Sequence, residues 1–232
     1  MGLRRWEELP AFMRTPQVAA YHRALSSHRT ALFWKRWWDL VLSSVLLILL
    51  WPLMAAIGVW IRSGSAGPAI FRQRRVTQYG RVFWIYKFRT MEAERKEAGG
   101  LITLEKDGRI TRAGRFLRRY RLDELPQLLN IWKGEMSFVG TRPEVPRYVR
   151  RYTEEMMATL LLPAGVTSEA SICFKDEAAL MAPYLAAGED VDEVYVRRVL
   201  PAKMAYDLKA VQSYSFLKEL QIMVRTVFAV LR

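Results

Sequence analysis

The sequence is poor in the residues that form disulfides and metal sites. It contains one cysteine, Cys173, and two histidines, His22 and His28, in 232 residues. A single cysteine excludes an internal disulfide and a zinc site built from cysteines, so we expect the folded part in a reducing compartment. The two histidines have no other clustered ligands nearby in the sequence, so we expect no structural metal site there.

Acidic residues are also scarce relative to basic ones. There are 36 Lys and Arg residues against 23 Asp and Glu residues, and the net charge is +13. This imbalance indicates an anionic partner, which is a nucleic acid, a lipid surface or a phosphorylated substrate. Because 51% of the residues are hydrophobic, the composition excludes a disordered chain and predicts one main domain with appendages.

Charge is absent from residues 40–61, "LVLSSVLLILLWPLMAAIGVWI". At about 1.5 Å per residue, a straight helix of this length would cross a hydrocarbon layer of about 30 Å. Pro52 lacks an amide hydrogen, so we expect a kink or break near Trp51. Basic residues flank both ends and favour the cytoplasmic side for each. The residues alone leave two alternatives open: a re-entrant helix-break-helix within one leaflet, or a kinked single-pass helix.

Side chains at the edges of this segment also have expected roles. Ser43 and Ser44 are expected to bond backbone carbonyls freed near the bend. Asp39 is expected to pair with Arg36 or to cap the first turn. Five tryptophans suit an interfacial belt: Trp34, Trp37, Trp38, Trp51 and Trp60.

The rest of the pattern predicts an α+β fold that is mostly helical with short strands. We divide the chain into an N-terminal amphipathic arm (1–33), the broken membrane helix (34–62) and a cytoplasmic domain (63–232), and we expect the arm on the lipid surface or another subunit. Strands are expected at 81–88 and 137–140, with a strand or extended segment at 165–174. Expected helices cover 92–100, 143–162 and most of 176–232, with breaks at Pro183, Gly188 and Pro201. The last 18 residues form an amphipathic helix that either packs on the domain or lies along the membrane.

Two adjacent carboxylates, Asp123 and Glu124, follow a segment dense in arginine. The arginines are Arg109, Arg112, Arg115, Arg118, Arg119 and Arg121. Arg112, Arg115 and Arg119 recur at helical spacing and form a field of positive charge that is expected to keep Asp123 ionised. An ionised carboxylate can serve as a metal ligand, a general base or a nucleophile. Attack on phosphorus requires that cations screen the repulsion between the carboxylate and the phosphate.

Further cations lie elsewhere in the sequence, at Lys87 and Arg89 in "YKFRTM" and at Arg142 in "GTRPE". Mg²⁺ is the natural companion of a carboxylate and a diphosphate, with Asp123 as its ligand, because it rarely needs a complete protein cage. A structural interpretation remains open beside this one. Asp123 would then cap the helix that restarts near Pro126, and the arginines would form a solvated face.

Four stretches together resemble one family. They are "KRWWDLVLSSVLLILLWPL", "FRQRRVTQYGRVFWIYKFRTM", "ITRAGRFLRRYRLDELPQLLNIWKGEMSFVGTRPE" and "AGVTSEASI". In this order they are similar to the bacterial sugar transferases, the monotopic polyprenol-phosphate phosphoglycosyl transferases. The resemblance runs from about residue 34 to the C-terminus, and the lack of a multi-span N-terminal region resembles the small form.

The resemblance implies transfer of a sugar 1-phosphate from a UDP-linked sugar to undecaprenyl phosphate, with release of UMP. It implies a membrane helix that is re-entrant and broken at Pro52, on the cytoplasmic face of the bacterial inner membrane. Asp123 matches the nucleophile that forms a covalent phosphosugar intermediate, and Glu124 matches its acidic partner. The basic positions that match are Lys87, Arg89, Arg118 and Arg142, which are candidates for phosphate contacts.

The expected partners are therefore the nucleotide sugar, undecaprenyl phosphate and membrane lipids, with a homodimer left open and nucleic acid not expected. A nucleic-acid-binding module is disfavoured by the uncharged run, and a membrane scaffold without catalysis is the remaining alternative. The chain departs from the family pattern at Thr141, where proline is common, and across 167–171, "TSEAS". The second departure lies where substrate selectivity is expected, so the resemblance does not identify the sugar.

Overall fold

The computed structural model describes residues 2–92, 108–174 and 177–231. The helix expected at 92–100 falls mainly outside the described residues. The N-terminal part and the long apolar helix comprise η1 (Trp6–Glu8), η2 (Ala11–Met13), α1 (Pro16–Ser26) and α2 (Arg29–Gly64). The middle part comprises β1 (Ile70–Val76), η3 (Gln78–Gly80), β2 (Val82–Phe88), α3 (Arg112–Arg119), η5 (Leu122–Glu124), α4 (Gln127–Trp132) and β3 (Met136–Val139). The last part comprises α5 (Pro146–Val149), η6 (Met156–Leu161), β4 (Ala164–Thr167), α6 (Glu169–Cys173), α7 (Glu177–Ala186), α8 (Val191–Val194), the π-helix η7 (Tyr195–Val199), α9 (Leu200–Gln212) and α10 (Phe216–Leu231).

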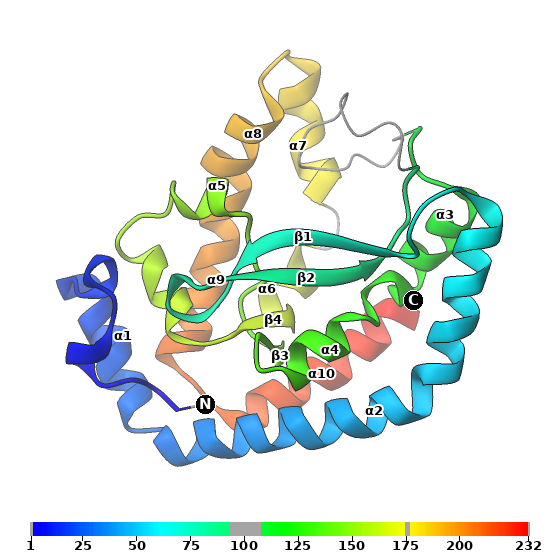
Figure 1. The fold of residues 1–232 in the computed structure, drawn as a ribbon. Helices are drawn as coiled ribbons and strands as arrows, with labels where there is room; N and C mark the ends of the chain where they lie inside the picture. The colour runs from blue at the N-terminus through cyan, green and yellow to red at the C-terminus, as the bar shows by residue number, and fades with distance from the viewer. Residues whose placement is uncertain (1, 93–107, 175–176, 232) are drawn as a thin grey trace.

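The longest element is α2, with 36 residues and Pro52 in its interior. It follows one edge of the molecule and then turns along the neighbouring side (Figure 1). An internal proline removes one helical hydrogen bond and clashes with the preceding turn, which accounts for such a bend. The helix continues through Pro52, so of the expected kink or break the structure has the kink. Within the described residues, α2 is the one helix long and apolar enough to cross a membrane.

Polar contacts attach the first part of α2 to the domain. Arg36 donates to the carbonyls of Ile131 (2.7 Å) and Trp132 (2.8 Å) at the end of α4. Asp39 accepts from the hydroxyl of Ser137 and the amide of Phe138. Asp39 therefore bonds the edge of β3, and the expected Asp39–Arg36 pair or first-turn cap is wrong. These contacts satisfy backbone groups that a helix end and a strand edge would otherwise leave open.

The two serines, Ser43 and Ser44, do not bond the backbone carbonyls near Pro52. Ser43 and Ser44 both donate to the carbonyl of Leu40, which lies far from Pro52 along the helix. They bond a carbonyl of their own turn, as helical serines commonly do. The expected role at the carbonyls freed by Pro52 is therefore corrected.

Among the described residues, four strands form two two-stranded sheets. β1 pairs antiparallel with β2, from Ile70 opposite Phe88 to Val76 opposite Val82. β3 and β4 pair in parallel. The strands expected at 81–88 and 137–140 are confirmed, while β1 was not predicted because its charged residues hide the alternation.

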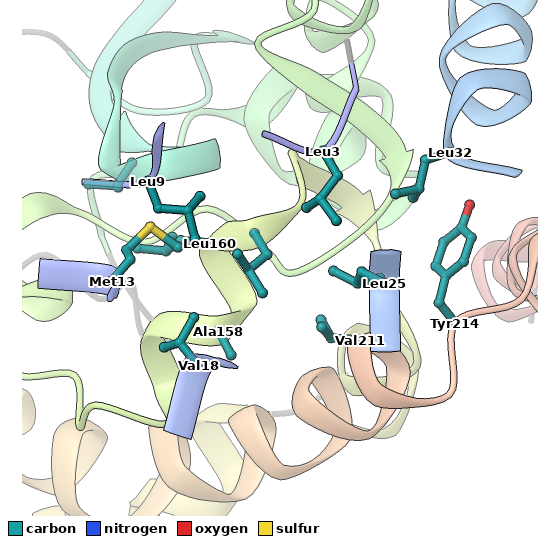
Figure 2. Close-up of a cluster of buried hydrophobic side chains, with 12 residues drawn as sticks. Leu3, Leu9, Met13, Val18, Leu25, Leu32, Ala158, Leu160, Val211 and Tyr214 are labelled. Atoms are coloured by element: carbon teal, nitrogen blue, oxygen red, sulfur yellow. The ribbon is translucent and has the colours of Figure 1, made fainter. Parts of the chain in front are cut away.

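The N-terminal arm packs on its own domain. Leu3, Leu9, Met13, Val18 and Leu25 belong to one buried cluster with residues of η6 and α9. Figure 2 shows these side chains converging on the same region as Ala158, Leu160, Val211 and Tyr214. Burial of each large aliphatic side chain contributes about 1.5–3 kcal/mol, so intramolecular contact determines the position of the arm. The expectation that it lies on lipid or another subunit is corrected.

Three further expectations need correction. The helix expected at 143–162 is two short pieces, α5 and η6, because the Thr153 hydroxyl accepts from the Met156 amide and starts a separate turn. Of the segment expected to be extended, 165–174, only 165–167 lies in a strand, β4, since Ser168 caps α6 immediately afterwards. Pro183 lies inside α7 and Pro201 in the first turn of α9, so neither ends a helix. Gly188, with φ of 84°, does separate α7 from α8.

Candidate active site

A strained turn carries the two adjacent carboxylates. α3 ends at Arg119, and Arg121 then adopts the left-handed conformation with φ of 53°. This conformation costs a residue with a side chain about 1–2 kcal/mol, and such residues cluster at functional sites. The turn redirects the chain into η5, which places Asp123 and Glu124 on the wall of a large cleft.

All six residues singled out from the sequence line this one cleft, whose volume is about 2030 Å³. They come from β2, the segment after it, α3, η5 and the loop after β3. They are Lys87, Arg89, Arg118, Asp123, Glu124 and Arg142. Of the three arginines expected on one face of α3, Arg115 and Arg119 line the cleft and Arg112 does not. The fold therefore gathers the candidates from positions up to 55 residues apart in the sequence.

Glu124 is the ion-paired member of the two. Its Oε1 accepts from Lys87 Nζ at 2.8 Å and from Arg142 Nη2 at 2.9 Å, and Arg121 Nη1 lies at 3.9 Å. Burial alone would raise the pKa of Glu124, but Lys87, Arg142 and Arg121 together outweigh it and hold the pKa well below its usual value. Glu124 is therefore a permanent anion that orders two cations at the cleft.

Asp123 has the opposite surroundings. Its Oδ1 is buried and has no hydrogen-bond partner among the described residues, and only 8% of the residue is exposed. Burial raises the pKa of Asp123, and Lys87 and Arg118 only partly oppose that rise. Arg118 and Arg121 lower this pKa in the expected direction, but burial outweighs them, and Lys87 and Arg142 pair with Glu124 instead. The helix-cap interpretation fails, since α4 begins after Pro126 and its N-cap has no side-chain bond.

Two of the candidate arginines, Arg118 and Arg89, have defined contacts. Arg118 Nε donates to Thr90 Oγ1 at 2.9 Å. This contact requires close packing of α3, and Gly114 allows it, because a Cβ there would lie 2.1 Å from the Thr90 carbonyl oxygen. Arg89 is buried and bonds Ser65 and Ala66, just beyond α2. Arg89 thereby connects the end of α2 to the cleft.

The loop that carries Arg142 is held by residues that the sequence analysis missed. Arg75 Nη1 donates to the carbonyl of Pro143 at 3.0 Å, and the Tyr195 hydroxyl donates to Glu144. Lys203 Nζ lies 3.9 Å from Glu144 and 2.7 Å from Glu177. These side chains line the same cleft, and Glu144 could have been found from its place beside Arg142 in "TRPE".

A divalent cation has one suitable ligand here. No group of three His, Cys, Asp or Glu side chains that could hold a metal lies within the part of the chain that the structure describes. The unpartnered Asp123 Oδ1 offers one hard oxygen, whereas Glu124 is already bonded to cations. Mg²⁺ binds through one or two carboxylates together with substrate phosphates and waters. The residues therefore fit a magnesium ion that arrives with a diphosphate.

Comparison with known proteins agrees with this arrangement. The model of a family described as "Bacterial sugar transferase" matches residues 30–232. The chain belongs to the bacterial sugar transferase family. This family comprises enzymes that transfer sugar phosphates, so the chain is an enzyme.

Named relatives share much of this transferase. It is 34% identical over 196 residues to the UDP-glucose:undecaprenyl-phosphate glucose-1-phosphate transferase of Caulobacter vibrioides, covering 83% of this chain and 68% of that protein. It is 35% identical over 198 residues to the protein of the same name from Xanthomonas campestris, covering 83% and 38%. It is 39% identical over 155 residues to the undecaprenyl-phosphate galactose phosphotransferase of Salmonella typhimurium, covering 60% and 32%. The matched region thus spans well under half of two of these relatives.

The segment 167–171, where the sequence departs from the family pattern, makes specific contacts in this transferase. Ser168 caps α6, and Glu169 forms an ion pair with Arg225 of α10 at 2.7 Å. Thr167 Oγ1 lies 2.7 Å from Thr226 Oγ1. The segment 167–171 therefore fastens α10 to the wall of the cleft.

Proposed function

We propose that this transferase moves a sugar 1-phosphate from a UDP-sugar to undecaprenyl phosphate, giving undecaprenyl-diphosphate-sugar and UMP. The observation that carries the proposal is the buried Asp123 Oδ1, which has no partner among the described residues, beside Lys87, Arg118 and Arg142 in one cleft. The named relatives, which act on UDP-glucose or on undecaprenyl phosphate, support this choice of substrates. The reaction would be the first membrane step of a surface glycan or glycoconjugate pathway.

In the first step, an Asp123 carboxylate oxygen bonds to the sugar-bearing phosphorus. The bond between that phosphorus and the bridging oxygen breaks, and UMP leaves with the electron pair. Lys87, Arg118 and Arg142 supply fixed positive charge for the phosphate oxygens, and their preorganisation reduces the barrier. Glu124 keeps Lys87 and Arg142 in place during the step, since it bonds both.

In the second step, an oxygen of the lipid phosphate bonds to the same phosphorus. The bond from phosphorus to Asp123 breaks and the carboxylate is restored. Covalent catalysis of this kind divides one difficult displacement into two and lets two bulky substrates use one site in turn. Mg²⁺ bound to Asp123 and the diphosphate would neutralise phosphate charge when present.

We further propose that α2 is re-entrant and enters only the cytoplasmic leaflet of the inner membrane. Pro52 in the helix interior and the bend of the ribbon support this topology, as do the basic residues on both flanks (Figure 1). Single cysteines at Thr30 and Ala66 test it with a membrane-impermeant thiol reagent in oriented vesicles. Labelling of both from the cytoplasmic side is expected, and labelling from opposite sides would establish a spanning helix.

The experiment that tests the reaction uses purified protein in lipid nanodiscs. Undecaprenyl phosphate, Mg²⁺ and a panel of UDP-sugars are supplied while UMP is measured. At least one donor is expected to release UMP in proportion to the lipid product. Absence of UMP from every donor, in a folded protein that still binds vesicles, would favour the scaffold without catalysis.

A further inference from the structure

The loop that carries Arg142 is attached to the domain on both sides of that residue. Before Arg142, the carbonyl of Thr141 accepts from the amide of Gly165 in β4 at 2.9 Å. After it, the carbonyl of Glu144 accepts from the amide of Val76 in β1 at 2.9 Å. The backbone around Arg142 is therefore held by two strands, and the side chain extends from it into the cleft.

The side chain of Glu144 adds a third attachment, which runs to the helices at the far side of the cleft. Its Oε1 accepts from the Tyr195 hydroxyl of η7 and lies 3.9 Å from Lys203 Nζ of α9. Lys203 Nζ also donates to the Tyr195 hydroxyl at 3.2 Å. The other oxygen of Glu144 lies 3.8 Å from Arg75 Nη1. Glu144, Tyr195 and Lys203 are all buried, and we call them the Glu144 cluster.

A wide helical turn brings Tyr195 and Lys203 to the same side of one helix. Residues 191–212 are helical without interruption, but the Leu200 amide donates to the carbonyl of Tyr195, five residues earlier. In a regular α-helix, side chains eight residues apart point about 80° away from each other around the axis. A π-turn takes up about one more residue, so eight residues here complete about two turns. Pro201 accounts for the wide turn, because its ring would clash with the carbonyl four residues earlier in a regular helix.

The Glu144 cluster is not the most stable way to fill this space. A buried carboxylate and a buried ammonium group both lose their hydration, and apolar side chains of similar volume often give equal or greater stability. Apolar residues do fill neighbouring positions of the same wall, at Val145 and Met181. Hydrogen bonds are directional, however, so the cluster gives Glu144 one defined orientation. Glu144 is two residues from Arg142, and its orientation sets the course of the loop.

From these contacts we infer that Tyr195 and Lys203 are positioning residues for Arg142, which act through Glu144. Glu124 orients the guanidinium group of Arg142, whereas the Glu144 cluster fixes the backbone from which the side chain extends. Arg142 is thereby placed for the donor phosphate before the reaction begins, and such preorganisation lowers the barrier. This inference rests on the proposed function, in which Arg142 supplies charge to the phosphate oxygens. A displacement of about 1 Å is enough to lower a rate about 10²-fold.

The test is a double-mutant cycle on the donor step. Tyr195→Phe removes only the hydroxyl, and Lys203→Met removes the charge while it keeps most of the length of the side chain. Each substitution is made alone and together with Arg142→Met. The proteins, in lipid nanodiscs, are mixed with a saturating concentration of the labelled UDP-sugar that gives the fastest UMP release. The rate of label uptake by the protein is measured without lipid acceptor, and the Tm of each variant is measured beside it.

Tyr148→Phe is the matched control. The Tyr148 hydroxyl donates to Asp192 instead of Glu144, so this substitution also removes one bond from a tyrosine to a carboxylate. Its ring packs against Tyr195, with 5.0 Å between the ring centroids, in the same hydrophobic cluster. The control therefore has a similar effect on packing and stability but leaves the contacts of Glu144 in place.

Tyr195→Phe and Lys203→Met are each expected to lower the rate of label uptake about tenfold, the effect of losing one hydrogen bond to a charged group. Arg142→Met is expected to lower the rate at least about 10²-fold. In the Arg142→Met protein, Tyr195→Phe and Lys203→Met should change the rate less than about twofold, because the group that they position is gone. Tyr148→Phe should keep the rate within about twofold in either protein, with a loss of Tm similar to that of Tyr195→Phe.

Two results would overturn the inference in a protein that takes up label. One is an equal effect of Tyr195→Phe and Lys203→Met with and without Arg142, because the cluster would then act independently of that residue. The other is an unaltered rate of label uptake in both single variants. If Lys203→Met does not fold, Tyr195→Phe alone decides with the same two readings. Absence of label from the unaltered protein would instead contradict the proposed function itself.

Discussion

Asp123 and Glu124 are adjacent in the chain but occupy contrasting regions of one cleft. On the Glu124 side, Lys87 and Arg142 bond a single carboxylate oxygen at 2.8 and 2.9 Å. On the Asp123 side, a buried carboxylate oxygen has no hydrogen-bond partner among the residues that the structure describes. In the proposed mechanism, this contrast makes Glu124 the counter-ion of the cations that would bind phosphate and leaves Asp123 available to react.

The largest expected effect follows from removing the carboxylate of Asp123. Asp123→Asn should lower the rate of sugar-phosphate transfer by at least about 10³-fold, as expected for loss of a covalent nucleophile. UMP release with undecaprenyl phosphate and a productive UDP-sugar measures this. A variant with near-normal turnover would show that the two regions do not differ in the way proposed.

The same variant should not lose stability. Folded Asp123 holds its proton more tightly than an unfolded aspartate, because its pKa is raised by burial. Its contribution to stability therefore falls as the pH rises from the unfolded pKa to the folded pKa, and an amide escapes that loss. We expect the Tm of Asp123→Asn to equal or exceed that of the unaltered protein at neutral pH, measured by thermal unfolding in nanodiscs.

Glu124→Gln should lose more stability and less activity than Asp123→Asn. It leaves Lys87 and Arg142 without their shared anion, and breaking a buried ion pair costs about 3–5 kcal/mol, reduced here to about 2–3 because both cations are partly exposed. The Tm should fall clearly, and activity should fall less than in Asp123→Asn. Equal stability of the two variants would remove the distinction between a structural and a reactive carboxylate.

A smaller effect concerns pH. Because burial raises the pKa of Asp123, the rate of protein labelling by the donor should rise with pH through a value above that of an ordinary aspartate. Lys87 is the main group that lowers this pKa, so in Lys87→Met the rise should move to higher pH. Single-turnover labelling across pH 4–9 measures both profiles. A profile that shifts to lower pH in Lys87→Met would contradict the assigned electrostatics.

The sequence predicted the parts of this protein that depend on local pattern. The uncharged run identified α2, the richness in aromatic and β-branched residues identified β2, and Pro126 indicated the restart at which α4 begins. Partners far apart in the chain could not be read this way. Asp39 bonds a strand about a hundred residues later, and Lys87 pairs with Glu124 because β2 packs against η5.

The candidate site shows the same division. The six residues singled out from the motifs all line the cleft, but the arginines near Asp123 in the sequence suggested that they would serve that carboxylate. Which carboxylate receives the cations depends on the left-handed turn at Arg121 and on the loop position of Arg142. Backbone geometry of that kind is not encoded in residue spacing.

The most direct test of the account is a search for the covalent intermediate. The protein is incubated with labelled UDP-sugar and no lipid acceptor, quenched, digested and mapped by mass spectrometry. The account predicts a phosphosugar on Asp123 that disappears when undecaprenyl phosphate is added. An enzyme that turns over while Asp123 never carries the label would contradict it.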